Sequence, residues 1–258
     1  KKGTAIDDHA HNNTTSVYTA ARIFPMLPER LSTDLTSLNA DQKRLTMVTE
    51  IVFDAEGNVL SNTAYRALAL NKAKLAYDSV AAWLEGKGEL PAAARAVAGM
   101  DAQLRMQDVV AQKLRARRRE QGALEFETIQ PKAVFDGDQV VDLNVQAHNR
   151  ARQLIEEFMI ATNQATAQFL GEKGFASLHR VVRSPERWQR IVDAAKDLGE
   201  VLPPEPDSKA LEDFLVRRRR ADPVRFPDLS LTIVKLMGAG EYVIDKPGRE
   251  SAGHFGLA

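Results

Sequence analysis

The sequence predicts an α+β fold in which a mixed, largely antiparallel sheet is flanked by helices. In the first part of the chain, short apolar runs alternate with turns rich in Gly, Asn and Asp, as is typical of paired strands. Longer segments with helical periodicity make up most of the remainder. Hairpins followed by helices in this way are typical of layered α+β domains. The chain has 258 residues, of which 44% are hydrophobic, so it can bury the core of one large domain.

Two hairpins have the clearest turn signals. The pattern of residues 45–53 predicts a strand, the Gly and Asn of residues 54–58 predict a turn, and a second strand is expected over 59–70. The same signature recurs within 133–143, where an Asp-Gly-Asp turn separates two apolar runs. The other non-helical predictions are a polar, turn-rich segment at 1–15, strands at 16–19 and 242–244, and a loop with two prolines at 23–28.

Helices are predicted where apolar residues recur three or four positions apart. The strongest such segment runs from about Val145 to Leu170. Its predicted buried face consists of Ile155, Phe158, Met159, Thr162, Ala165 and Phe169. Another helix is expected to begin at Ser184-Pro185-Glu186, because Ser caps helices and Pro suits the first turn, and to end at Gly199. The remaining predicted helices span 76–84, 97–121, 207–220 and 227–237.

The composition excludes several classes of protein. Without cysteine, the chain has no disulfide partner, thiolate zinc site, iron–sulfur cluster or cysteine nucleophile. No apolar run reaches the ~18 residues of a membrane helix, so we expect no membrane partner. The basic start Lys1-Lys2-Gly3-Thr4 has no apolar segment behind it and is not a secretory signal, so a cytoplasmic location is expected. The 35 acidic and 35 basic residues balance, and any nucleic-acid binding would therefore use a local groove.

One short cluster contains residue types that bind metals. His9 and His11 lie close to Asp7 and Asp8, and divalent metals take imidazole and carboxylate ligands. Small polar residues near a terminus are more often solvated, and we favour that interpretation over a metal site.

Two basic runs are found at 115–119 and 217–220, each at the end of a predicted helix. Arginines at a helix C-terminus interact favourably with the helix dipole, so we favour solvated helix ends over contact with phosphates. The sequence contains no Gly-rich phosphate loop, GxSxG elbow or HExxH helix.

Longer strings that recur in one order along nearly the whole chain are more informative. They are Ser16–Thr19, Phe24–Ser32, Asp34–Asn39, Lys72–Asp78, Ile155–Asn163 and His254–Ala258. In this order and spacing the strings resemble the catalytic, RNB-type domain of the ribonuclease II and ribonuclease R family. The proline-rich string that begins at Phe24 is the most specific of them, followed by the string that begins at Ile155.

The resemblance implies a processive 3′→5′ exoribonuclease that hydrolyses single-stranded RNA and releases 5′-mononucleotides. It also implies a magnesium ion, held by a cluster of aspartates, that activates water and neutralises charge on the phosphate. The fold of the family is a mixed sheet flanked by helices, which agrees with the fold predicted from the pattern. Single-stranded RNA is therefore the expected partner and Mg²⁺ the expected cofactor.

This chain departs from the family pattern at both ends. The aspartate cluster is expected upstream of Lys1, because the spacing to Tyr18 aligns Asp7-Asp8 with a later, non-catalytic stretch. Asn13 also stands where the family pattern usually has Arg. The arginine that contacts the scissile phosphate is expected after Ala258. We therefore expect residues 1–258 to be the central portion of a single RNB-type catalytic domain, incomplete at both ends.

Such a segment would contain no catalytic or metal-binding residue and would be inactive alone. Flanking segments or a second chain would be needed to complete the site. The alternative is a non-catalytic RNA-binding remnant, or one half of a split enzyme, with the same fold.

Four residues match RNA-binding positions of the family one by one. Tyr18 matches the aromatic residue that stacks on the base at the 3′ end of the RNA. Phe126 matches the aromatic residue that caps the other end of the stacked nucleotides. Tyr77 and Glu156 match polar groups near the terminal ribose, where a carboxylate that accepts from a 2′-hydroxyl favours RNA over DNA. The alternative for each aromatic residue is ordinary half-buried packing.

Helical geometry sorts Glu156 from its neighbour. At ~100° per residue, Glu156 flanks the predicted buried face of its helix, whereas Glu157 is expected to point to solvent. Asn163 follows about two turns later on the same side as Glu156.

Overall fold

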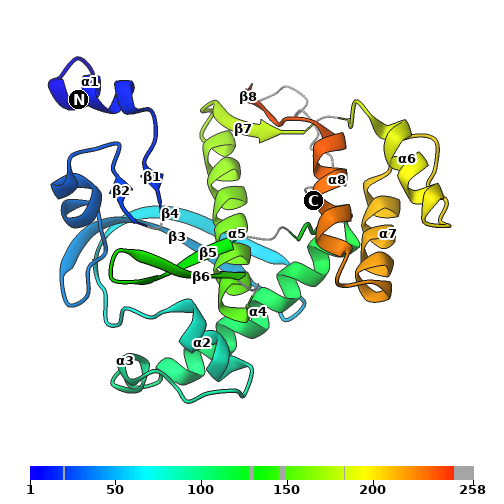
Figure 1. The fold of residues 1–258 in the computed structure, drawn as a ribbon. Coiled ribbons are helices and arrows are strands. Elements are labelled where there is room, and N and C mark those ends of the chain that lie inside the picture. Colours follow the sequence, from blue (N-terminus) through cyan, green and yellow to red (C-terminus); the bar gives the residue numbers. More distant parts are fainter. Residues whose placement is uncertain (20, 128–130, 146–148, 183, 247–258) are drawn as a thin grey trace. The chain divides into compact units, whose positions relative to one another are not determined.

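A computed structural model of the chain describes residues 1–19, 21–127, 131–145, 149–182 and 184–246 (Figure 1). Helices and small antiparallel sheets make up the fold, so the predicted α+β class is confirmed. The described strands form four separate two-stranded sheets, because each pairs with one partner. The chain divides into two compact units: one contains residues 1–48, 64–106 and 130–152, and the other contains 49–63, 107–129 and 153–258.

The first unit begins with a helix that the sequence pattern did not predict. Helix α1 (Ala5–Asn13) is capped by Thr4, whose hydroxyl accepts from the backbone N–H of Asp7 at 3.4 Å. The prediction of a turn-rich segment over 1–15 was therefore wrong for residues 5–13. The misleading feature was composition, since none of the residues of this helix is buried.

Two short strands and a π-helix follow. Strand β1 (Val17–Tyr18) pairs antiparallel with β2 (Ile23–Phe24). The prolines after β2 exclude helix, as predicted, and a π-helix, η1 (Arg30–Leu35), begins beyond them.

The longest strands form the hairpin predicted from its turn. Strand β3 (Lys43–Phe53) and β4 (Val59–Leu70) are joined by a tight turn, in which the carboxylate of Asp54 accepts from the backbone N–H groups of Glu56 and Asn58. Gly57 in this turn has a φ of +83°, which favours glycine. The second predicted hairpin is also present, as β5 (Pro131–Asp136) and β6 (Gln139–Val145).

Helices of the first unit have a small core. Helix α2 (Tyr77–Leu84) buries Val80 and Ala81 against Ala151, and the short α3 (Ala92–Arg95) follows. Two long helices, α4 (Met100–Glu120) and α5 (Arg150–Glu172), begin in the first unit and continue into the second. None of the described helices is long and apolar enough to cross a membrane.

The second unit contains the main hydrophobic core. Three helices build it: α6 (Trp188–Asp197), α7 (Ser208–Ala221) and α8 (Phe226–Met237). Their fully buried members include Ile191, Leu211, Phe214, Phe226 and Ile233. Strand β7 (Ser177–Val181), which the sequence pattern missed, pairs with the predicted strand β8 (Glu241–Asp245).

The start of α6 differs from the prediction. The helix begins at Trp188 with Arg187 in the cap position, so Ser184 does not cap it. The indole N–H of Trp188 donates to the carbonyl oxygen of Pro203 at 3.0 Å. The end at Gly199 is confirmed, with a φ of +77°.

The face of α5 that is buried also differs from the prediction. Of the predicted face, Ala165 is buried as expected, whereas Ile155 and Met159 are 47% and 57% exposed. The other buried positions of the helix are Ala151, Leu154, Glu157 and Ala161. Apolar periodicity pointed to the wrong face because one of the buried residues is a glutamate that pairs with an arginine of α4.

The end of α4 provides a test of local packing. Gly122 follows α4 with a φ of +87°, and a Cβ atom there would lie 2.8 Å from Ser208 Oγ and 3.1 Å from the backbone nitrogen of Lys209. Gly174 has a similar φ of +76° with no atom within 4 Å of its Cβ position. Gly174→Ala should therefore lose only the ~1–2 kcal/mol of left-handed strain. Gly122→Ala should lose about 1–3 kcal/mol more from overpacking, measured by urea unfolding. Equal losses would show that the packing around Gly122 is loose.

Candidate functional site

Tyr18 is the most exposed of the four predicted site residues. It ends the two-residue strand β1, opposite Ile23, and is 75% exposed. The turn behind it is closed by Thr19, whose hydroxyl donates to the carbonyl oxygen of Arg22 at 2.6 Å. The Tyr18 ring therefore has the accessible surface that stacking on a base requires.

Tyr77 is the first residue of α2 and is half-exposed. The guanidinium of Arg152 lies 4.8 Å from the centre of its ring, so a cation covers one ring face. The next residue, Asp78, accepts from the side chain of Asn149 at 2.9 Å, and Asn149 in turn accepts from the backbone N–H of Arg152 at 3.0 Å. These contacts hold Tyr77 at the start of α5. They leave its hydroxyl as the group available for polar recognition.

Glu156 is exposed on α5, whereas Glu157 is 3% exposed. The prediction that Glu157 points to solvent is therefore wrong. Its carboxylate accepts two hydrogen bonds from Arg118 of α4, at 2.9 Å from Nε and 2.7 Å from Nη2. A bidentate guanidinium compensates a carboxylate for the loss of water, which allows a glutamate on the buried face.

Phe126 lies in the segment that follows α4 and is half-buried. It packs against the core formed by α6, α7 and α8. The preceding Glu125 receives two bonds from Arg115, at 2.5 Å from Nε and 2.9 Å from Nη2. Phe126 is thus held both by packing against this core and by the hydrogen bonds of the residue before it.

The pKa values of two acids near Phe126, Glu125 and Glu212, are shifted in opposite directions. Burial opposes ionisation of Glu125, but the hydrogen bond and charge of Arg115, with the charge of Arg119, outweigh it and lower the pKa. Burial raises the pKa of Glu212, which is only partly offset by the backbone N–H of Glu125. The pKa of Arg115 is raised by its hydrogen bond to Glu125.

Several arginines of the two basic runs are held by acids instead of projecting as solvated helix ends. Arg115 pairs with the half-buried Glu125, and Arg118 pairs with the buried Glu157. Arg119 lies 3.4 Å from Oε1 of the buried Glu212. In the second run, Arg217 pairs with Glu200 and Arg219 with Glu125. The interpretation as solvated helix ends is wrong for the arginines that pair with buried acids, because their partners lie on other elements and are invisible to a local pattern.

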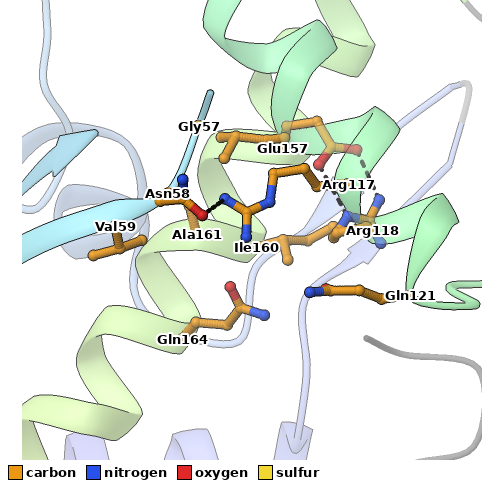
Figure 2. A pocket seen from close by; sticks show the side chains of 11 residues that line it. Gly57, Asn58, Val59, Arg117, Arg118, Gln121, Glu157, Ile160, Ala161 and Gln164 are labelled. Carbon is orange, nitrogen blue, oxygen red and sulfur yellow. Dashed lines mark hydrogen bonds and ion pairs between the residues drawn. The ribbon is translucent and has the colours of Figure 1, made fainter. Parts of the chain in front are cut away.

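Helix α4, helix α5 and the β3–β4 turn line a cavity of about 360 Å³ within the second unit (Figure 2). Arg118 and Glu157 pair in its wall, and Arg117 bonds to the side chain of Asn58. The amides of Gln121 and Gln164 face this space. Arg118 and Glu157 therefore compensate each other within the wall, whereas the charged Arg117 bonds to a neutral amide.

The histidines at the start of the chain do not come together. His9 and His11 are two positions apart on α1, and His9 Nε2 lies 2.9 Å from the side-chain nitrogen of Asn13. Among the residues that the structure describes, no group of three or more His, Cys, Asp or Glu side chains could hold a metal ion. The described residues therefore do not fit a metal centre.

The four predicted site residues divide between the units. Tyr18 and Tyr77 belong to the first, and Phe126 and Glu156 to the second. The acids and arginines around Phe126 were not predicted as a site. No local sequence signal could have found them, because Glu212 and Arg219 lie 87 and 94 positions away from Glu125.

Comparison with known proteins supports the resemblance. All residues 1–258 match the family model described as RNB domain. The chain is 33% identical over 263 residues to Ribonuclease R of Vibrio cholerae and 31% identical over 266 residues to Ribonuclease R of Escherichia coli. These alignments cover 99% and 100% of this chain but 30% and 31% of the relatives, so the chain spans less than a third of their length.

Solved structures show the same likeness. One is described as Mycoplasma genitalium RNase R in complex with ribose methylated single-stranded RNA; its TM-score is 0.85 at 25% identity, over 99% of this chain and 39% of that chain. Yeast Ssd1, described as a pseudonuclease, has a TM-score of 0.72 at 16% identity, over 100% of this chain and 31% of that chain. The second likeness shows the fold alone.

The raised pKa of Glu212 predicts a pH-dependent stability. At a pH just above its usual value of 4.5, the folded chain still holds the proton that the unfolded chain has lost, so stability falls as the pH rises toward the folded pKa. Glu212→Gln cannot ionise and lacks this fall. The free energy of unfolding of the variant, relative to the unmodified protein, should therefore increase over this pH interval in urea titrations. The exposed Glu120→Gln serves as control, and a difference for Glu212→Gln that does not rise with pH would contradict the assignment.

Proposed function

Because this chain belongs to the RNB domain family, we propose that it is the central portion of the catalytic domain of a 3′→5′ exoribonuclease. The protein hydrolyses single-stranded RNA processively and releases 5′-mononucleotides. The observation that supports this most strongly is the match of all 258 residues to the family, together with relatives named Ribonuclease R at 31–33% identity.

We assign the RNA contacts as follows. Tyr18 and Phe126 stack on bases, which is sequence-tolerant and suits an enzyme that accepts any RNA. Tyr77 and Glu156 contact the terminal ribose, where the exposed carboxylate accepts a hydrogen bond from a 2′-hydroxyl. The exposure of Tyr18 and Glu156 supports these roles.

Magnesium is the proposed cofactor, and its ligands lie outside these 258 residues. The described residues offer no suitable ligand group, so we assign no metal ligand to them, and we expect the catalytic residues outside this segment as well. When bound, the ion would activate water and neutralise charge on the phosphate. Flanking segments or a second chain would complete the site. The cytoplasmic location stays a prediction.

A second candidate is a non-catalytic RNA-binding protein of the same fold, or one half of a split enzyme. The likeness to a structure described as a pseudonuclease supports considering it, because this fold occurs in that protein too. The lack of a metal-ligand group among the described residues fits both candidates.

The two candidates differ in a degradation assay. The full-length protein, incubated with uniformly labelled single-stranded RNA and Mg²⁺, should release labelled 5′-mononucleotides without accumulating intermediates, and EDTA should abolish the reaction. The 258-residue segment alone should leave the RNA intact. Full-length protein that binds but does not shorten RNA would favour the non-catalytic candidate. A segment that degrades RNA by itself would overturn the placement of the metal site.

Binding measurements in the presence of EDTA should distinguish stacking on bases from recognition of the ribose. Tyr18→Ala should reduce the affinity for single-stranded RNA and for single-stranded DNA equally, by about 5- to 150-fold. The reason is that stacking on a base contributes ~1–3 kcal/mol whatever the sugar. Glu156→Gln should reduce the affinity for RNA but not for DNA, by roughly tenfold, because the charge-assisted hydrogen bond to the 2′-hydroxyl is lost. The exposed Tyr242→Ala and Glu120→Gln are matched controls. Equal losses for RNA and DNA in Glu156→Gln would refute the ribose contact.

A further inference from the structure

The backbone is tied down on both sides of Phe126. The N–H of Glu125 donates to Glu212 Oε2 at 3.0 Å, and the N–H of Glu127 donates to Ser230 Oγ at 2.8 Å. Glu212 belongs to α7 and Ser230 to α8, and both acceptors are fully buried in the second unit. The peptide group before Glu125 and the peptide group between Phe126 and Glu127 are therefore fixed to separate helices.

Arg219 of α7 adds contacts to both neighbours of Phe126. Its Nη2 donates to the carbonyl oxygen of Glu125 at 3.1 Å, and its Nη1 donates to Oε2 of the same residue at 3.2 Å. Its Nε lies 3.6 Å from Glu127 Oε2. The guanidinium also lies over the ring of Phe226, 4.6 Å from the centroid, so a packed aromatic side chain supports it.

The first basic run reaches the same carboxylates. Arg115 binds the Glu125 carboxylate through two nitrogens, and Arg119 lies 3.4 Å from Glu212 Oε1 and 4.0 Å from Glu125 Oε2. Three arginines thus meet the three acids Glu125, Glu127 and Glu212. The cluster carries no excess positive charge for a polyanion.

We propose that Arg219 and Glu212 are positioning residues that hold Phe126 as a rigid stacking platform for single-stranded RNA. Arg115 and Arg119 support this arrangement through the same acids. The arginines act on the carboxylates of the protein and not on RNA phosphates. The inference rests on the stacking role of Phe126 in the proposed function and extends it to the residues that set the ring in place.

Rigidity of this kind affects binding through entropy. A half-buried aromatic residue on an irregular segment would otherwise have to be ordered when a base stacks on it, which reduces affinity. With the flanking peptide groups already bonded, that ordering takes place during folding. Loss of Arg219 should therefore weaken stacking on Phe126 although Arg219 itself never contacts RNA.

A double-mutant cycle in the full-length protein tests this inference. Arg219→Met, Phe126→Ala and the double variant are compared for affinity to labelled single-stranded oligoadenylate in EDTA. Phe126→Ala should weaken binding about 5- to 150-fold. Arg219→Met should weaken it about fivefold or more in the unmodified protein and less than about twofold in the Phe126→Ala background, since coupled residues are not additive. Arg217→Met is the matched control, because Arg217 pairs with Glu200 instead.

The salt dependence separates positioning from phosphate contact. Loss of one phosphate contact would reduce the slope of log affinity against log salt concentration by ~0.7 for a single strand. Arg219→Met should leave the slope unchanged. A reduced slope, or a loss that adds fully to that of Phe126→Ala, would assign Arg219 to the phosphates and overturn the inference.

The outcomes distinguish this inference from the function on which it rests. If Phe126→Ala leaves the affinity unchanged, the stacking role fails and the inference fails with it. If Phe126→Ala weakens binding and a folded Arg219→Met does not, only the positioning role is wrong. Thermal unfolding shows whether Arg219→Met is folded. If it is not, Ser230→Ala takes its place, because it removes the hydroxyl that accepts from the backbone N–H of Glu127 and changes no charge. The same non-additivity with Phe126→Ala is then expected, and the same outcomes of the cycle are decisive.

Discussion

The pairing of arginines with buried glutamates is the interaction on which the second unit depends. Removing one partner of a buried ion pair typically costs ~3–5 kcal/mol, because the other charge is left uncompensated. Arg118 and Glu157 form such a pair, with exposed fractions of 14% and 3%. Replacing both partners of a pair with apolar residues is often neutral, so these pairs favour one arrangement of helices more than they add stability. Through them α4 is joined to α5 and, by way of Glu212, to α7.

The end of α4 lies beside these ion pairs and is set by a glycine. Gly122 takes a left-handed conformation that ends the helix against Ser208 and Lys209. The segment that follows then runs past the same arginines that end α4. Arg115 and Arg119, one turn apart on α4, thus have two effects. Arg119 joins α4 to α7 through Glu212, and Arg115 binds Glu125, the residue before Phe126.

What could be predicted from sequence was what local chemistry decides. The Asp54 turn, the cap of α7 by Asp207 and the end of α6 at Gly199 depend on neighbouring residues, and their signals are short-range. The buried face of α5 could not be predicted in this way. Apolar periodicity assigns a glutamate to the surface, and the arginine that compensates Glu157 lies 39 positions away in the sequence. The same limit applies to the basic runs, whose partners lie on other elements.

In the candidate site, too, the sequence indicated individual residues but not the contacts that hold them. Family resemblance identified Tyr18, Tyr77, Phe126 and Glu156, but nothing in the sequence pattern distinguishes how each is held. Tyr18 stands on a two-residue strand and is 75% exposed, whereas hydrogen bonds to α7 and α8 hold the residues on both sides of Phe126. An aromatic residue on so short a strand can adjust to the base that it meets, whereas an anchored one presents the same surface to every base. For the exoribonuclease that we propose, which would accept any RNA sequence, an adjustable and a fixed stacking surface would be complementary. The neutral charge of the chain is consistent with this, because the arginines around Phe126 are used to build the fixed surface.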